Sequence, residues 1–185
     1  MYLGSSPGIR PDYTAAAERL AAVLAERGLG LVYGGAHVGT MGVIADAVLA
    51  AGGEVVGVIP ASLADKEVAH LGLTELHVVE SMHERKLLMM ERSDGFVCLP
   101  GGSGTLEELF ETFTWLQLGI HHKPIGLLDV AGYWAPLVGF LDHAVSEGFV
   151  RREHADLLLV DDDPERLLDR FATWTPPNTA KWVEA

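Results

Sequence analysis

The chain has 185 residues, of which 49% are hydrophobic and 21% are charged, a balance typical of a globular protein with one sizeable core. Its formal net charge of -13 argues against an extended nucleic-acid-binding face, which would need a basic surface. Cys98 is the only cysteine, so no internal disulfide can form, and no segment has the pattern of a membrane span or a signal peptide. These features predict a cytoplasmic protein with neither nucleic acid nor a membrane as a partner.

Short apolar runs alternate with amphipathic segments of helical length along the chain. The runs predicted as strands are residues 2–4, 29–33, 54–59, 75–79, 95–99, 124–128 and 157–160. The segments predicted as helices are residues 12–27, 39–51, 82–92, 106–118, 133–147 and 164–171. This alternation predicts an α/β fold in which helices cover both faces of a parallel sheet. We expect one domain over residues 1–172 and a tail over residues 173–185, where the core pattern is absent.

The segment 99–108, LPGGSGTLEE, carries the strongest functional signal. An apolar strand runs into a glycine-rich turn, and the turn opens onto an amphipathic run that begins at Thr105. Glycines let backbone N–H groups approach an anion closely, and a helix N-terminus adds a favourable dipole. The carboxylate of Glu108 follows close to the same spot. An anion cradle beside a carboxylate can hold a phosphorylated substrate and act on it.

Polar or glycine-rich segments follow three further predicted strands, at residues 4–8, 34–42 and 81–86. Each alone is more often a tight turn, but loops after parallel strands share one sheet edge, where ligands bind. The G-x-G-x-x-G and P-loop patterns are absent, which argues against a standard dinucleotide or NTPase site. Histidine spacings typical of a metal site and the G-x-S-x-G pattern are absent too, so we expect neither a bound metal nor a serine hydrolase.

Two interpretations of Glu108 stay open at this level. Thr105 and Glu108 have the spacing of a capping box, in which the acid would only cap the helix. The same acid could instead face a ligand. Glu107 lies about 100° further around the helix, so at most one of the two acids faces the site.

Arg85 and Lys86 also have two interpretations. They follow a capping box that begins at Ser81, and a solvated basic pair near the helix start is the simpler one. Arg85, however, shares one helical face with Met82 and Met89, an apolar setting that is unusual for a surface arginine.

Taken together, residues 82–86 (MHERK) and 100–108 (PGGSGTLEE) resemble the LOG ("Lonely Guy") family. These proteins are cytokinin riboside 5'-monophosphate phosphoribohydrolases, also called lysine decarboxylase-like proteins. The family pattern P-G-G-x-G-T-x-x-E is met at every position, and the loops at residues 4–6, 33–35 and 39–42 are similar as well. The resemblance extends from the start of the sequence to about residue 171.

The resemblance implies a Rossmann-like, doubly wound fold, a homodimer and no cofactor. It implies hydrolysis of the N-glycosidic bond of N6-modified AMP, giving free base and ribose 5-phosphate. Arg85 and Glu108 would be the catalytic pair. The residues it places around the substrate are Ser5, Gly34, Gly35, Glu67, Met82, Lys86, Gly102, Ser103, Gly104, Thr105 and Thr114, with a weaker match at Glu67 and Thr114.

Cleavage of a ribosyl C–N bond builds positive charge on the sugar and negative charge on the departing purine. Glu108 would stabilise the sugar cation or activate water. A guanidinium stays protonated in proteins, so Arg85 would orient the ribose phosphate and stabilise charge. Two alternatives remain: a broader nucleosidase that acts on AMP or other nucleoside monophosphates, and a non-catalytic carrier of a nucleotide or the molybdenum cofactor on the same fold.

Overall fold

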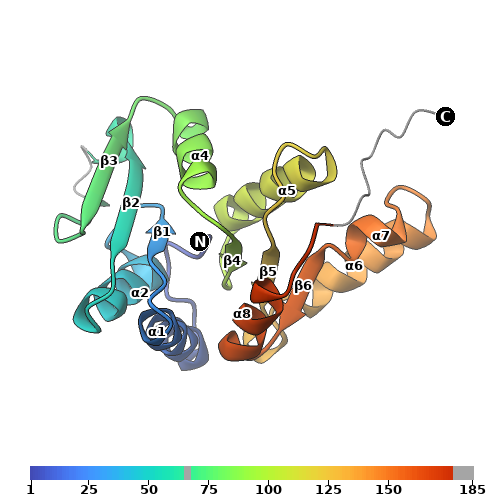
Figure 1. The fold of residues 1–185 in the computed structure, drawn as a ribbon, viewed down its shortest axis with the longest axis horizontal. Helices are drawn as coiled ribbons and strands as arrows, with labels where there is room; N and C mark the ends of the chain where they lie inside the picture. The colour runs from blue at the N-terminus through green and yellow to red at the C-terminus, as the bar shows by residue number, and fades with distance from the viewer. Residues whose placement is uncertain (65–67, 177–185) are drawn as a thin grey trace.

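The computed structural model describes residues 1–64 and 68–176 (Figure 1). The strands are β1 (Leu31–Tyr33), β2 (Val55–Pro60), β3 (Glu75–Val79), β4 (Phe96–Cys98), β5 (Ile125–Leu128) and β6 (Leu158–Asp161). The longer helices are α1 (Pro11–Glu26), α2 (Gly39–Ala50), α4 (Met82–Glu91), α5 (Ser103–Gln117), α6 (Ala135–Ser146) and α8 (Pro164–Ala172). Short helical segments are α3 (Ala61–Leu63), η2 (Val130–Gly132) and α7 (Arg152–Ala155). The predicted α/β order is confirmed, whereas the short segments had no sequence signal.

The strands are all parallel and form two three-stranded sheets, in the orders β1-β2-β3 and β4-β5-β6. The start of the chain lies between them. The Met1 ammonium donates to the Val32 carbonyl at 2.6 Å, and the Tyr2 N–H donates to the Val97 carbonyl at 3.0 Å. The strand predicted at residues 2–4 is therefore wrong in extent: it is reduced to one bridge between Tyr2 and Cys98, because the chain turns into a loop at Gly4.

Two apolar cores lie on the two faces of the layer that the two sheets form, and Figure 1 shows the helices on either side of it. Side chains alternate along a strand, so neighbouring residues of β4 serve different cores: Val97 packs toward α1, α2 and α8, whereas Phe96 and Cys98 pack toward α4, α5 and α6. Both sets are buried. This two-sided burial explains the uninterrupted apolar strands and confirms helices on both faces.

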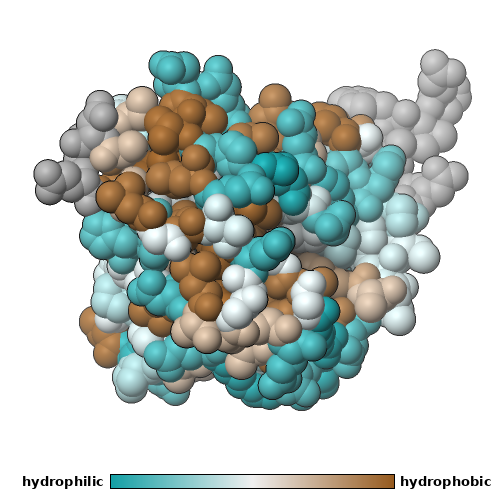
Figure 2. All heavy atoms as spheres, turned by 60° about the vertical axis from the view of Figure 1, so that its left-hand side comes forward, coloured by the Kyte–Doolittle hydropathy of each residue, from teal (hydrophilic) through white to brown (hydrophobic). Residues whose placement is uncertain are grey.

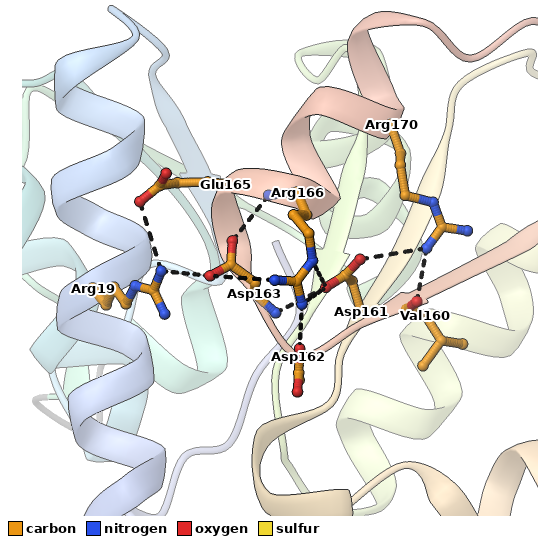
Figure 3. A network of polar contacts seen from close by, with 8 residues as sticks. All are labelled: Arg19, Val160, Asp161, Asp162, Asp163, Glu165, Arg166 and Arg170. Atoms are coloured by element: carbon orange, nitrogen blue, oxygen red, sulfur yellow. Dashed lines mark hydrogen bonds and ion pairs between the residues drawn. The ribbon is translucent and has the colours of Figure 1, made fainter.

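A polar network fastens α8 to α1 and to the end of β6 (Figure 3). Asp163 caps α8 by accepting from the Arg166 N–H at 3.0 Å and also binds Arg19 of α1. Asp161 binds Arg166 and Arg170. Partial burial raises the pKa of Asp161, but the Asp163 N–H and the arginines outweigh it, so the pKa is lowered. The arginines are about half exposed, so each ion pair stabilises the fold only slightly.

The described residues include no helix long and apolar enough to cross a membrane. The proposed domain boundary after residue 172 coincides with the end of α8. Most of the expected tail, residues 177–185, lies outside the described part of the chain. The boundary therefore stays a prediction.

Candidate active site

The loops after several strands meet at the carboxyl edge of the sheet, as the sequence predicted. Thr40 donates a hydrogen bond from its Oγ1 to the Gly4 carbonyl at 2.9 Å. A Cβ built on Gly39, where φ is +59°, would lie 2.3 Å from the carbonyl carbon of Ser5, so these two loops touch through their backbones. A Cβ on Gly4 would lie 3.4 Å from the Gly101 Cα. The loops at residues 4–8, 34–42 and 100–108 are thus in direct contact.

Arg85 and Glu108 form a buried ion pair between α4 and α5. The Arg85 Nη2 lies 3.1 Å from the Glu108 Oε1, and the two residues are 9% and 8% exposed. The Arg85 Nη1 faces the Met82 sulfur at 3.7 Å, and its Nε lacks a hydrogen-bond partner among the described residues. Buried donors are normally satisfied. The guanidinium therefore has hydrogen-bonding capacity left for a ligand.

Gly34, at the end of β1, makes room for this guanidinium. A Cβ at this position would lie 2.2 Å from the Arg85 Nη2, so any side chain would displace it. Gly35 has a φ of +75° and packs against Val58 and Ile59 of β2. These contacts give both glycines a role in shaping the loop, and direct substrate contact by either stays a proposal.

The helix α5 begins at Ser103, earlier than predicted, with Gly102 as its N-cap and without a side-chain cap. The predicted capping box of Thr105 and Glu108 is therefore wrong. Thr105 lies inside the first turn, so Glu108 is carried one turn further on, to Arg85. A Cβ on Gly102 or on Gly104 would meet nothing within 4 Å. The first turn is thus open, and its unpaired N–H groups suit an anion.

The surroundings of Glu108 alter its protonation. Burial raises the pKa of Glu108, and the opposing charge of Arg85 lowers it by less, so the pKa lies above its ordinary value. A carboxylate in this state is closer to the operating range of an acid–base group than an exposed glutamate is.

Lys86 lies on the other side of the same α4 turn and connects it to α5. Its ammonium, with the residue only 5% exposed, binds the Glu107 carboxylate and the Glu111 Oε1, the latter at 2.9 Å. Burial lowers the pKa of Lys86, but the two carboxylates raise it by more. Glu107 therefore helps to hold α4 against α5 and is not a free surface acid. The Lys86 ammonium is already bound to two carboxylates of α5.

One of the two hydrogen bonds of the capping box predicted at the start of α4 is present. The Ser81 Oγ accepts from the Glu84 N–H at 3.2 Å. The Glu84 carboxylate accepts from the Glu80 N–H at 2.8 Å rather than from Ser81. The cap fixes the start of α4 and hence the turn on which Arg85 lies.

A cavity of about 210 Å³ lies between the loop at residues 4–8 and the loop at residues 100–102. Ser5, one of the predicted substrate-binding residues, lines it, and so does Gly102. Tyr133, which the sequence analysis did not single out, closes another side. No sequence signal marked it, because Tyr133 begins a predicted helix and is brought to the cavity by the turn at Ala131.

Other predicted site residues lie apart from this group or cannot be placed. Ser103 is exposed in the open first turn of α5. Thr114 is exposed further along the helix, and its Oγ1 donates to the Phe110 carbonyl at 2.7 Å, so the chain does not bring it to the ion pair. Glu67 lies outside the described residues. Within residues 1–64 and 68–176, no three His, Cys, Asp or Glu side chains form a group that could hold a metal.

A parallel sheet with ligand-ready loops at its carboxyl edge defines a Rossmann-like α/β protein. The family model described as "Possible lysine decarboxylase" matches residues 41–171. The "Probable cytokinin riboside 5'-monophosphate phosphoribohydrolase LOGL5" of Oryza sativa subsp. japonica is 47% identical over 96% of this chain and 72% of its own length. The cytokinin riboside 5'-monophosphate phosphoribohydrolase of Rhodococcoides fascians is 49% identical over 89% of this chain and 84% of its own.

The chain belongs to this LOG, or lysine decarboxylase-like, family, as its motifs indicated. Among solved structures, the molybdenum cofactor binding protein of Rippkaea orientalis superimposes with a TM-score of 0.68 at 20% identity. It covers 92% of this chain and 93% of its own. The molybdenum cofactor carrier protein of Chlamydomonas reinhardtii gives a TM-score of 0.65 at 20% identity, over 89% and 91% of the two chains. At this identity the likeness concerns the fold.

Proposed function

We propose that the protein hydrolyses the N-glycosidic bond of N6-modified AMP and releases an adenine-type base and ribose 5-phosphate. The observation that carries this proposal is the buried Arg85–Glu108 pair next to the open first turn of α5. The names of relatives that are 44–49% identical support the same activity. The second reactant is water, and the proposal includes no cofactor.

The residues divide the work as follows. Backbone N–H groups of residues 102–105 hold the 5'-phosphate at the helix N-terminus. As the C1'–N9 bond breaks, its electron pair leaves with the purine and positive charge builds on the ribose. Ionised Glu108 stabilises that charge or takes a proton from the attacking water, whose oxygen bonds to C1', and the released proton neutralises the departing purine. Arg85 offers its unpaired Nε–H to a substrate oxygen and keeps the Glu108 carboxylate in place through Nη2.

The remaining predicted contacts are part of the same proposal. Ser5 lines the cavity beside the phosphate position, and Met82 flanks Arg85. Lys86 acts through the orientation of α4 and α5 that its two carboxylates fix. Contacts of Thr114 and Glu67 with the nucleotide are proposed on the family resemblance alone.

We also propose a homodimer in the cytoplasm. Figure 2 shows hydrophobic residues gathered on the face that carries β3 and α4. Val78 of β3 and Leu87 of α4 are 57% and 46% exposed, and such patches on a folded protein favour association. Sedimentation equilibrium of the wild type and of Leu87→Glu tests this; a wild type that stays monomeric would contradict it. A cytoplasmic location agrees with a single cysteine, Cys98, that is buried and free.

The function is tested by incubating the purified protein with AMP and with isopentenyl-AMP and detecting free base by chromatography. We expect release of base from the N6-modified nucleotide in preference to AMP. Equal release from both substrates would support a broader nucleosidase. Binding of the nucleotide without release of base would support a carrier and contradict the proposal.

A further inference from the structure

Tyr133 reaches from the loop after β5 to the glycine-rich loop before α5. Its hydroxyl donates a hydrogen bond to the Gly101 carbonyl at 2.5 Å. The two residues are 32 positions apart in the sequence, so the contact joins two of the loops at the carboxyl edge of the sheet. Both residues line the cavity of about 210 Å³.

The backbone that carries Tyr133 is held in an unusual conformation. Ala131 has a φ of 55°, the only positive value for a residue other than glycine in the described part of the chain, and Gly132 follows with a φ of 74°. The Asp129 carboxylate accepts from the Trp134 N–H at 2.6 Å, and Trp134 is buried. A non-glycine residue in the left-handed region is strained, and such strain persists where the surroundings enforce it, often at functional sites.

The Tyr133 ring is also fixed. It makes edge contacts with Tyr13, at 5.8 Å and 81°, and with Trp134, at 5.0 Å and 88°. A ring held on two sides presents its hydroxyl in one direction. The hydroxyl therefore acts on Gly101 as a fixed donor rather than as a mobile surface group.

The peptide between Gly101 and Gly102 is where a fixed donor matters. Glycine backbones rotate freely, so this peptide has little side-chain restraint of its own. A trans peptide is planar and its C=O and N–H point in opposite directions. By binding the Gly101 carbonyl, Tyr133 sets the direction of the Gly102 N–H, at the N-cap of α5.

Gly101 is also tightly packed against the start of the helix. A Cβ on Gly101 would lie 2.1 Å from the Thr105 Oγ1 and 2.9 Å from the Gly4 nitrogen. The carbonyl that Tyr133 binds thus belongs to a residue wedged between the first turn of α5 and the first loop.

We propose that Tyr133 is a positioning residue that orients the Gly101–Gly102 peptide for binding of the substrate's phosphate. This inference rests on the proposed function for the identity of the substrate. It adds to that function a residue outside the two motifs, on a different loop. Tyr133 acts through the peptide it binds and takes no part in bond cleavage.

The test compares Tyr133→Phe with Ser146→Ala. The first variant keeps the ring contacts and removes the hydroxyl that binds Gly101. The second also removes a hydroxyl that donates to a backbone carbonyl, that of His143 at 2.7 Å, but at the end of α6 and away from the cavity. We expect Tyr133→Phe to raise KM and the inhibition constant of inorganic phosphate about threefold to tenfold, the effect of one hydrogen bond, with a smaller change in kcat. We expect Ser146→Ala to retain wild-type values.

A second measurement separates this inference from the proposed function. Inorganic phosphate should raise the Tm of the wild type and of Ser146→Ala, and Tyr133→Phe should need a several-fold higher phosphate concentration for the same shift. This readout needs no turnover, so it decides the role of Tyr133 even if N6-modified AMP is not hydrolysed. A wild type without a phosphate-dependent shift, or equal phosphate responses in all three proteins, would overturn the proposal. A lower Tm of Tyr133→Phe without phosphate, with unchanged phosphate affinity, would reduce Tyr133 to a structural role and overturn it as well.

Discussion

The two ends of the sheet each carry a cavity, and the two cavities differ in chemistry. At the amino ends of the strands, a cavity of about 470 Å³ lies among mostly apolar side chains, including Leu31, Val97, Leu168 and Phe171. At the carboxyl ends, the smaller cavity of about 210 Å³ lies among glycine-rich loops. Size alone would point to the first. Converging backbone amides, an open helix N-terminus and a buried ion pair with one unpartnered donor, the Arg85 Nε, favour the second as the proposed active site.

The difference also shows in what each end does with buried charge. The Met1 ammonium, which borders the apolar cavity, is buried so fully that its pKa falls to about 6. One carbonyl, that of Val32, accepts from it. Arg85 and Glu108 are buried together and compensate each other, and the Met1 ammonium is close enough to act on the pKa of Glu108 as well. The Met1 ammonium joins the start of the chain to β1, whereas the Arg85–Glu108 pair keeps two charged groups buried at the proposed active site.

The largest expected effect comes from breaking the ion pair. Glu108→Gln removes the negative charge that would meet the ribosyl cation, so kcat should fall by about 10² to 10⁴. Arg85→Ala should lower kcat by a similar factor and also destabilise the fold by about 3 kcal/mol, because it leaves a buried carboxylate without its partner. Steady-state kinetics and thermal unfolding measure both.

Glu107→Gln is the matched control for these variants. It changes the neighbouring acid on the same helix, which binds Lys86 rather than Arg85, and it leaves Glu111 to hold Lys86 in place. We expect its kcat to stay within about threefold of wild type, as for a change that leaves the reacting groups in place. Near-normal turnover in Glu108→Gln, or an equal loss in Glu107→Gln, would contradict the assignment of Glu108.

A smaller effect is expected from Gly34→Ala. The added Cβ would lie 2.2 Å from the Arg85 Nη2, so the guanidinium must shift away from Glu108. A displacement of this kind should lower kcat/KM about 10- to 100-fold while the protein stays folded. Gly139→Ala in α6, where a Cβ meets nothing within 4 Å, should leave kcat/KM unchanged and raise stability by about 0.5–1 kcal/mol. Equal activities of the two variants would disprove the role of Gly34.

The pH dependence should report Glu108 directly. Its pKa is raised chiefly by burial, so the acid limb of kcat/KM should lie above the ordinary range of a glutamate. Because Arg85 lowers that pKa, the residual activity of Arg85→Ala should show the limb at still higher pH. For stability the sign is opposite to that of a salt-bridged surface acid: the folded state binds the proton more tightly than the unfolded state does, so protonation of Glu108 as the pH falls stabilises the fold.

Unfolding free energies test this sign. As the pH falls through the acid limb, the unfolding free energy of the wild type should rise relative to that of Glu108→Gln. An acid limb at the ordinary glutamate position, or one that Arg85→Ala leaves in place, would show that Glu108 does not govern the profile.

Sequence patterns predicted the fold well because hydrophobic periodicity is a local property. The alternation of strands and helices, and the rule that parallel strands end at one edge, were enough to bring Arg85 and the loop of residues 99–108 together. The exact start of α5 was not predictable, because Thr105 offered a good cap and two glycines allowed an earlier start. That earlier start excludes the capping role that the sequence left open for Glu108. Tyr133 depends on a strained turn at Ala131 that has no sequence signature.

The smallest effect on activity is expected at the amino end of the sheet, from Leu168→Ala. Leu168 is 7% exposed and lines the apolar cavity, so its truncation should enlarge that cavity and destabilise the fold by about 2–4 kcal/mol. Glu165→Ala, an exposed change on the same helix, should alter stability by less than about 0.5 kcal/mol. Denaturant unfolding measures both.

Below the unfolding transition, kcat/KM of Leu168→Ala should stay within about twofold of wild type, since distant and independent sites act additively. The reason is geometric: Leu168 packs in the core with α1 and α2, whereas Arg85 and Glu108 lie between α4 and α5 on the opposite face of the sheet. A large loss of activity in the folded variant would mean that packing at the amino end sets the position of the proposed catalytic pair. The two ends would then form one functional unit rather than a structural end and a reactive one.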